Sequence, residues 1–181
     1  MSFINRVSFR MMAFYHETLY GMFRDPYEVL EAAGLQEGQN VLEVGCGPGF
    51  FTIPAAEIVG DEGGLQAIDI NPVAVEYVKE KIKDSSINNV KVKLENAAQT
   101  EFPAEEFDLV FVFGLARVKE GSLDEVWGEV ARILKPDGVL SVEGRVSPPE
   151  KLFKSMESTG RVEKFYKDQH YTVHEEVGIN E

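Results

Sequence analysis

The chain has 181 residues, of which 44% are hydrophobic, and 31 acidic against 18 basic side chains give a formal net charge of −13. The length suits one domain with a substantial core, and the composition excludes an intrinsically disordered chain. The acidic balance and the lack of a basic cluster argue against nucleic acid as a partner, because such a surface needs basic side chains to neutralise phosphates.

The sequence also bears on disulfides, metal sites, membrane spans and the cellular compartment. One cysteine excludes an intrachain disulfide, and three histidines without ligand spacing predict no metal site. No apolar stretch reaches the roughly 18 residues of a membrane span, and the first residues lack a signal-peptide pattern. We therefore expect a cytoplasmic protein. These features predict no oligomeric state.

Residues 1–33 form a first segment, rich in phenylalanine, methionine and tyrosine, that we expect to be helical. Its last helix begins at Asp25 and Pro26, a typical capping pair, and ends at Gly34. Three interpretations of this segment stay open: a lid over a bound ligand, a helix packed on a sheet, or a docking surface for a membrane or a partner.

The next stretch, 40–69, carries the most informative pattern. A strand at 40–44 ends in a glycine-rich bend (Gly45, Gly47, Gly49), a helix runs from about 49 to 60, and a second strand ends at Asp69. Parallel strands end at one edge of a sheet, where bare glycines let a ligand lie close and a carboxylate accepts hydrogen bonds from a ribose. The pattern therefore predicts a site for a nucleoside cofactor.

The remaining elements continue to alternate. We predict a helix with Val75, Val78 and Ile82 on one face, and then further strands and helices at 90–94, 109–113, 122–134 and 139–143, the last after a turn at 135–138. A helix at 150–158 and two strands at 162–166 and 171–176 end the chain. This order predicts a single α/β domain over 1–181, with a mostly parallel sheet and helices on both faces.

Four landmarks in this order resemble one known family. The residues 43–49 (Glu-Val-Gly-Cys-Gly-Pro-Gly), Asp69, the strand at 107–113 and the turn at 132–141 resemble the class I S-adenosylmethionine-dependent methyltransferases of the small-molecule, methyltransferase-domain type. The resemblance implies a Rossmann-like, seven-stranded sheet that ends in an antiparallel hairpin. It divides the chain into an N-terminal lid (1–33), a cofactor-binding core (34–147) and a C-terminal helix and hairpin (148–181).

The resemblance also implies roles around S-adenosylmethionine. The glycine loop would lie against its methionine and ribose, Asp69 would bind the ribose, and Ile70 would pack on the adenine unless it is plain core. Glu43 would lie near the amino end of the cofactor, with a structural salt bridge as the rival interpretation. Asn96 stands where the family usually has aspartate, with Glu95 as another candidate for that contact. The expected cofactor-binding residues are Glu43, Gly45, Cys46, Gly47, Gly49, Asp69, Ile70, Asn96, Ala97 and Phe113.

The implied activity is methyl transfer to a small-molecule acceptor or, less favoured, to a protein. No catalytic group stands out; Tyr15, His16 and Arg117 are weak candidates, and Arg117 fits a surface ion pair better. A non-catalytic cofactor-binding or partner-binding subunit is the alternative. An NAD-dependent oxidoreductase comes third, because Phe50 stands at the position, three residues after Gly47, where a dinucleotide loop needs glycine.

Overall fold

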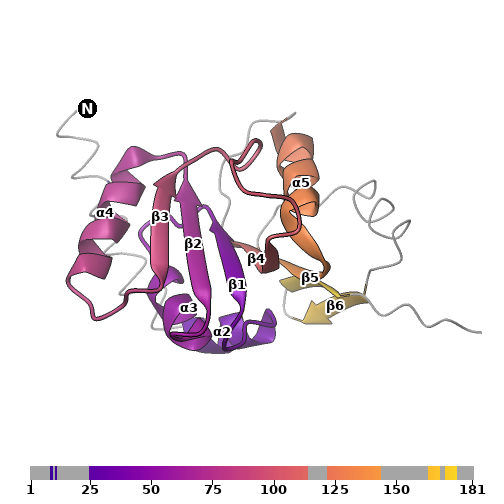
Figure 1. Cartoon of the computed structure of the whole chain (residues 1–181), viewed down its shortest axis with the longest axis horizontal. Helices are drawn as coiled ribbons and strands as arrows, with labels where there is room; N and C mark the ends of the chain where they lie inside the picture. The colour runs from indigo at the N-terminus through magenta and orange to yellow at the C-terminus, as the bar shows by residue number, and fades with distance from the viewer. Residues whose placement is uncertain are drawn as a thin grey trace, which may run out of the picture.

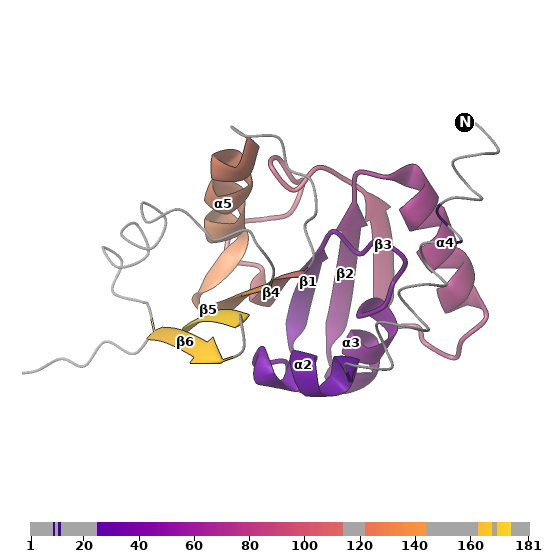
Figure 2. The same cartoon turned by 180° about the vertical axis from the view of Figure 1, so that it is seen from behind.

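The computed structural model describes residues 25–113 and 122–143, together with Phe9, Met11 and the backbone of 163–167 and 170–174. Strands and helices alternate along the chain and build one sheet with helices on either side (Figures 1 and 2). The strands are β1 Asn40–Val44, β2 Gly64–Asp69, β3 Val90–Leu94, β4 Phe107–Phe113 and β5 Leu134–Glu143. The helices are α2 Pro26–Ala32, α3 Thr52–Val59, α4 Pro72–Lys83 and α5 Ser122–Ile133.

The five strands β3-β2-β1-β4-β5 are neighbours in that order, and all four pairs are parallel. The predicted α/β fold with a parallel sheet is therefore confirmed. Beyond β5 the backbone of two short strands, β6 Glu163–Lys167 and β7 His170–His174, extends the order to β7-β6. The pairs β5–β7 and β7–β6 are antiparallel. The predicted helix at 150–158 lies outside the described residues.

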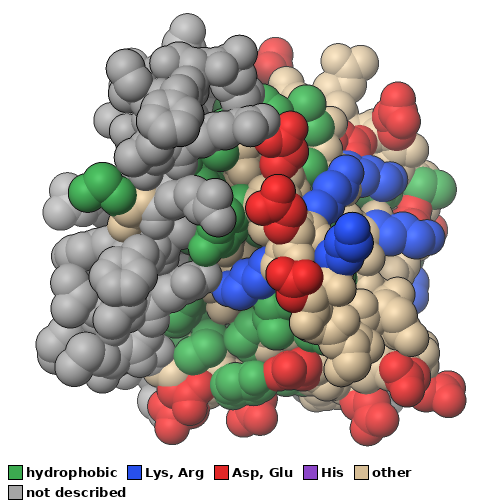
Figure 3. Space-filling view, turned by 90° about the vertical axis from the view of Figure 1, so that its left-hand side faces the viewer, with side chains coloured by type: hydrophobic (Ala, Val, Ile, Leu, Met, Phe, Trp, Pro, Cys, Tyr) green, Lys and Arg blue, Asp and Glu red, His purple; other side chains and the backbone are tan. Residues whose placement is uncertain are grey.

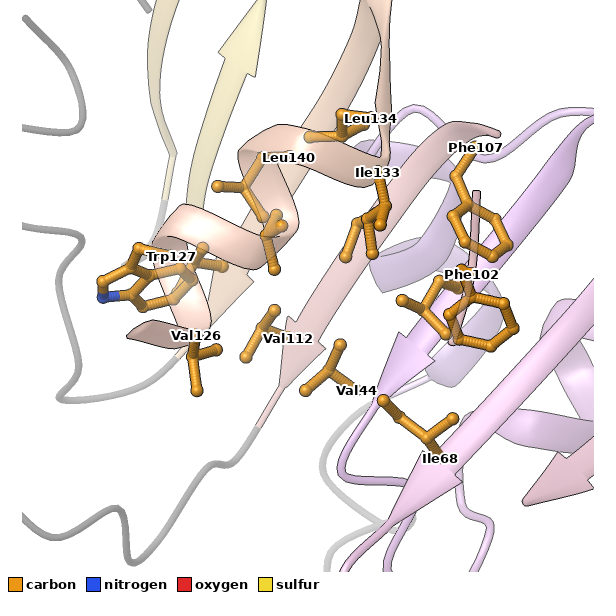
Figure 4. Close-up of a cluster of buried hydrophobic side chains, with 14 residues drawn as sticks. Val44, Ile68, Phe102, Phe107, Val112, Val126, Trp127, Ile133, Leu134 and Leu140 are labelled. Atoms are coloured by element: carbon orange, nitrogen blue, oxygen red, sulfur yellow. The ribbon is translucent and has the colours of Figure 1, made fainter. Parts of the chain in front are cut away.

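Alternate residues of the strands face two separate cores, as expected for strands covered on both faces. Helices α2, α3 and α4 pack on one face, and α5 packs on the other. In the core between α5 and the sheet, Trp127 and Val126 of α5 lie over Val112 of β4 (Figure 4). Within the described part of the chain, no helix has the length and apolar character needed to cross a membrane.

The starts of two elements differ from their predictions by three residues or more. The helix after β1 begins at Thr52 and not near Gly49, because Gly49 has φ +78° and cannot continue a right-handed helix. Strand β5 begins at Leu134, within the predicted helix, and the expected turn becomes an irregularity inside the strand, where the register shifts between Phe107 and Leu109. A Cβ on Gly138 would lie 3.0 Å from the backbone carbonyls of Lys135 and Phe107, a tight contact that glycine avoids.

Hydrogen bonds around Glu129 hold the β3–β4 connection against α5. One carboxylate oxygen of Glu129 accepts hydrogen bonds from the Thr100 N–H (2.8 Å) and the Thr100 hydroxyl (2.6 Å). Arg132 donates to the same oxygen at 2.6 Å and to the Phe102 carbonyl at 2.8 Å. The Arg132 guanidinium and then Thr100 lower the pKa of Glu129 to about 2, against the opposing effect of burial.

Strand β3 lies at one edge of the sheet, and its exposed face carries Lys91 and Lys93. Helix α4 beside it exposes Lys79 and Lys83. Figure 3 looks onto this side and shows the basic side chains gathered there, with acidic ones between them. Charged side chains on an edge strand hinder pairing with a second chain.

Candidate cofactor-binding site

The carboxylate of Asp69 and the glycine loop meet at the carboxyl edge of the sheet. The Gly47 N–H donates to Asp69 Oδ2 at 2.9 Å, and the Asn71 N–H donates to Oδ1 at 2.8 Å. These two donors fix the carboxylate in one orientation. Since a carboxylate has about four positions for accepting hydrogen bonds, roughly two remain for the hydroxyl groups of a ligand.

The three glycines of the loop are required for different structural reasons. All three have positive φ (+78° at Gly45, +50° at Gly47 and +78° at Gly49), a conformation that other residues adopt only with strain. A Cβ on Gly49 would lie 3.0 Å from a methyl carbon of Val78, so this glycine also permits packing on α4. Among the described residues beyond its chain neighbours, a Cβ on Gly47 would meet only the Gly45 carbonyl, at 4.0 Å. The backbone at Gly47 is therefore not packed against another described element there.

Glu43, the acid at the end of β1, is buried, with 3% of its surface exposed. Within the described residues its hydrogen-bonding partner is the Thr52 hydroxyl, at 2.6 Å, and not a lysine or arginine. Burial raises the pKa of Glu43 to about 8, the Thr52 hydrogen bond opposes that rise, and the charges of Asp69 and Lys81 act in opposite directions. Among the described residues, the structural salt bridge considered above is not found.

Cys46 contributes packing to the loop. Its thiol is buried against Ala67 and Val78, and its N–H donates to the Ile68 carbonyl at 3.1 Å. Burial, and then the nearby acidic groups, raise the pKa of the thiol. The thiol is therefore neutral in the ordinary pH range, and it is unsuited to act as a nucleophile.

Two aliphatic side chains are exposed beside Asp69. Ile70 is 69% exposed, so the interpretation of Ile70 as a core residue is wrong. Leu94, which pairs with Asp69 in the register of β2 and β3, is 57% exposed. Apolar surface next to a carboxylate suits a ligand that combines a flat base with a sugar.

Asn96 and Ala97 follow β3. The Asn96 side-chain oxygen accepts from the Ala98 N–H at 3.0 Å, and Ala97 packs against the α5 core. Glu95, the other candidate, accepts from the Glu101 N–H at 2.7 Å. Both polar side chains therefore brace the loop after β3 and have acceptor capacity left.

Phe113 ends β4 on the face opposite α5 and is nearly buried. Its ring lies 5.0 Å from that of Phe51, which immediately precedes α3. The rings connect the end of β4 to the glycine loop. Tyr15, His16 and Arg117, the weak catalytic candidates, lie outside the described residues.

Three side chains around the site were missed by the sequence analysis. Thr52 holds Glu43, Asn71 caps α4 with its side chain, and the Lys81 ammonium reaches the Gly49 carbonyl at 3.5 Å. Asn71 could have been found, because asparagine before Pro72 is a typical helix start. Nothing in the spacing of Thr52 or Lys81 indicates their partners.

Phe9 is a described residue of the N-terminal segment that contacts this region. It is buried against Val73 and Ala74 of α4, and its ring lies 5.8 Å from that of Tyr77. Helix α4 starts directly after Asp69 and Asn71, so Phe9 attaches the first segment near the site edge.

Comparisons with known proteins show similarity to methyltransferases. A family model described as "Methyltransferase domain" matches residues 35–178. A demethylmenaquinone methyltransferase of Listeria welshimeri is 35% identical over 115 residues, 63% of this chain and 48% of that protein. A nocamycin O-methyltransferase of Saccharothrix syringae is 33% identical over 77% of this chain and 50% of its own. The chain thus spans about half the length of the curated relatives it matches.

The fold has close counterparts among solved structures. A SAM-dependent methyltransferase from Aquifex aeolicus has a TM-score of 0.72 and 24% identity, covering 95% of this chain and 98% of its own. At this identity the likeness shows a common fold. The fold, the family model and the site geometry together supply the basis for a functional assignment.

Proposed function

Because the chain belongs to the S-adenosylmethionine-dependent methyltransferase family, we propose that it transfers the methyl group of S-adenosylmethionine to a small-molecule acceptor. Two relatives named for small molecules, demethylmenaquinone and nocamycin, support this class of acceptor over a protein or a nucleic acid. The observation that carries the proposal is the hydrogen bond between Gly47 and Asp69 beside a space that a Cβ would fill.

The residues at the edge of the sheet fit this cofactor. Asp69, already oriented by two N–H donors, would accept from the ribose hydroxyls. The bare backbone at Gly47 would lie against the ribose and methionine portion, and exposed Ile70 would cover the adenine. Asn96 would accept from the adenine amino group, and Glu43 would face the amino end. Gly45, Cys46, Gly49, Ala97 and Phe113 would shape the pocket through backbone and packing contacts.

The cofactor supplies a sulfonium methyl group that an acceptor can attack with departure of a neutral thioether. The protein's own task is to hold donor and acceptor in line, about 3–3.5 Å apart, and to exclude water. A cationic ligand would favour the ionised form of Glu43 beside Asp69. A general base is needed only for an acceptor that carries a weakly acidic proton, with Tyr15, His16 and Arg117 as the polar candidates.

We extend the proposal to three further features: the first segment, the number of strands and the cellular compartment. The first segment serves as a lid over the site, which the attachment of Phe9 to α4 supports. The sheet has seven strands and a C-terminal hairpin, which the antiparallel register of β5, β7 and β6 supports. The protein works in the cytoplasm, an assignment that is based on its single cysteine.

Titration calorimetry of the full chain with S-adenosylmethionine tests the proposal. The variant Asp69→Ala should weaken binding by about 1.5–3 kcal/mol, the scale of hydrogen bonds to a charged group. The matched control is Asp61→Ala, which removes an exposed acid at the other end of β2. Unchanged affinity in Asp69→Ala would reject its role.

Two further titrations separate the rivals. Binding without methyl transfer to a broad panel of small acceptors would favour the non-catalytic subunit. Binding of NAD in place of S-adenosylmethionine would favour the oxidoreductase and contradict the proposal.

A further inference from the structure

Thr52 has an unusual role for a threonine in the first turn of a helix. A helical threonine hydroxyl usually faces water or bonds to a carbonyl three or four residues earlier. Thr52 is fully buried (0% exposed), and its hydroxyl donates at 2.6 Å to Glu43 Oε2, nine residues earlier on β1. The hydroxyl also lies 3.5 Å from the position of a Cβ on Gly49. Thr52 therefore joins the acid of β1 to the start of α3, directly after the glycine loop.

Among the described residues, few charged groups act on Glu43. Asp69 on β2 disfavours the ionised form of Glu43, and Lys81 on α4 favours it. The Cys46 thiol in the loop is neutral, and Phe111, the register partner on β4, is apolar. Among the described residues, the Thr52 hydroxyl is thus the closest group that stabilises the carboxylate.

We propose that Thr52 is a positioning residue that holds the Glu43 carboxyl and thereby sets the pH range in which the site accepts its cationic cofactor. The inference rests on the proposed function. Since the pKa of Glu43 is raised to about 8, this carboxyl is largely protonated at neutral pH. A cation bound beside it favours the carboxylate, so the carboxyl O–H breaks and the proton passes to the solvent.

The expected result is a cofactor affinity that depends on pH. Below the pKa of Glu43 the affinity should fall by up to about tenfold for each pH unit, because one proton must leave on binding. Calorimetry at pH 7 in two buffers with different ionisation enthalpies should show proton release in the wild type and none in Glu43→Gln. Affinity that is independent of pH, with no proton release, would overturn the inference.

Substitutions at Thr52 separate positioning from packing. Thr52→Val keeps the shape and removes the hydroxyl, so the pKa of Glu43 and the midpoint of the affinity profile should both rise, by about one pH unit. Thr52→Ser keeps the donor and should leave both near the wild-type values. Thr100→Val, which removes the corresponding hydroxyl beside Glu129, should leave both unchanged.

The pKa of Glu43 is measured directly by carbon NMR of the carboxyl group, without added cofactor. If Thr52→Val does not fold, Thr52→Ala serves with the same expectation. An equal pKa of Glu43 in the folded Val or Ala variant and in Thr52→Ser would overturn the positioning role. No binding of S-adenosylmethionine at any pH would overturn the proposed function itself, whereas binding without proton release overturns this inference alone.

Discussion

Two glutamates, each bound by a threonine hydroxyl at 2.6 Å, lie in two regions of this molecule and have opposite electrostatics. Glu129, on the α5 side, also binds Arg132 and a backbone N–H, and its pKa is lowered to about 2. Glu43, below the glycine loop, has one hydroxyl donor and a pKa raised to about 8.

The opposite pKa shifts distinguish Glu129, a carboxylate that stabilises the fold, from Glu43, a carboxyl group that a ligand can stabilise. The donors around Glu129 are all supplied by the protein, so its charge is stabilised by folding alone. Around Glu43 the described residues supply one donor and considerable burial, so a cation from outside has the most to contribute.

Gly47→Val should have the largest effect on the glycine-loop side. A side chain there would fill the space beside the loop, so the affinity for S-adenosylmethionine should fall at least about 100-fold, or ~2.8 kcal/mol. Gly38→Val is the matched control, because Gly38 also has positive φ (+82°) and open surroundings among the described residues. Calorimetry in which both variants bind like the wild type would mean that the loop does not contact the cofactor.

The two glutamates should contribute to the free energy of unfolding with opposite pH dependence. The folded pKa of Glu43 is raised, so the folded chain holds a proton that the unfolded chain loses above about pH 4.5. Its contribution to the free energy of unfolding therefore declines as the pH rises from about 4.5 to about 8, by at most ~1.4 kcal/mol per pH unit. Urea titrations of wild type and Glu43→Gln across this range test it; parallel curves would contradict the raised pKa.

Glu129→Gln should reduce stability by about 1–2 kcal/mol, because Arg132 and Thr100 lose their charged acceptor. The folded pKa of Glu129 is lowered, so its contribution is complete above about pH 4.5 and is lost as the pH falls toward 2. The control, Glu125→Gln, changes an exposed acid on the same helix. Weaker cofactor binding in Glu129→Gln would show that the two regions are coupled.

Thr100→Val should have the smallest effect, about 0.5–1 kcal/mol of stability, because Arg132 and the Thr100 N–H still bind Glu129. Thermal unfolding measures it. A loss larger than that of Glu129→Gln would contradict the order of contributions in this cluster.

The sequence was most informative where local chemistry determines structure. The bounds of β1 and β3 agree with their predictions, since apolar runs are bounded there by turn residues. The meeting of the glycine loop with Asp69 followed from the topology of parallel strands. In contrast, the start of β5 at Leu134 depends on pairing with Phe107, a long-range contact that no local pattern indicates. The partner of Glu43 likewise depends on how α3 packs on β1.

Lys91 and Lys93 on the edge strand have a consequence for solution behaviour. Two molecules that approached each other along β3 would bring their ammonium groups together, and the repulsion opposes intermolecular pairing of the backbones. Acetylation of these amines would remove that protection. Acetylated protein should therefore form β-rich aggregates that light scattering detects at concentrations where the unmodified protein stays dispersed.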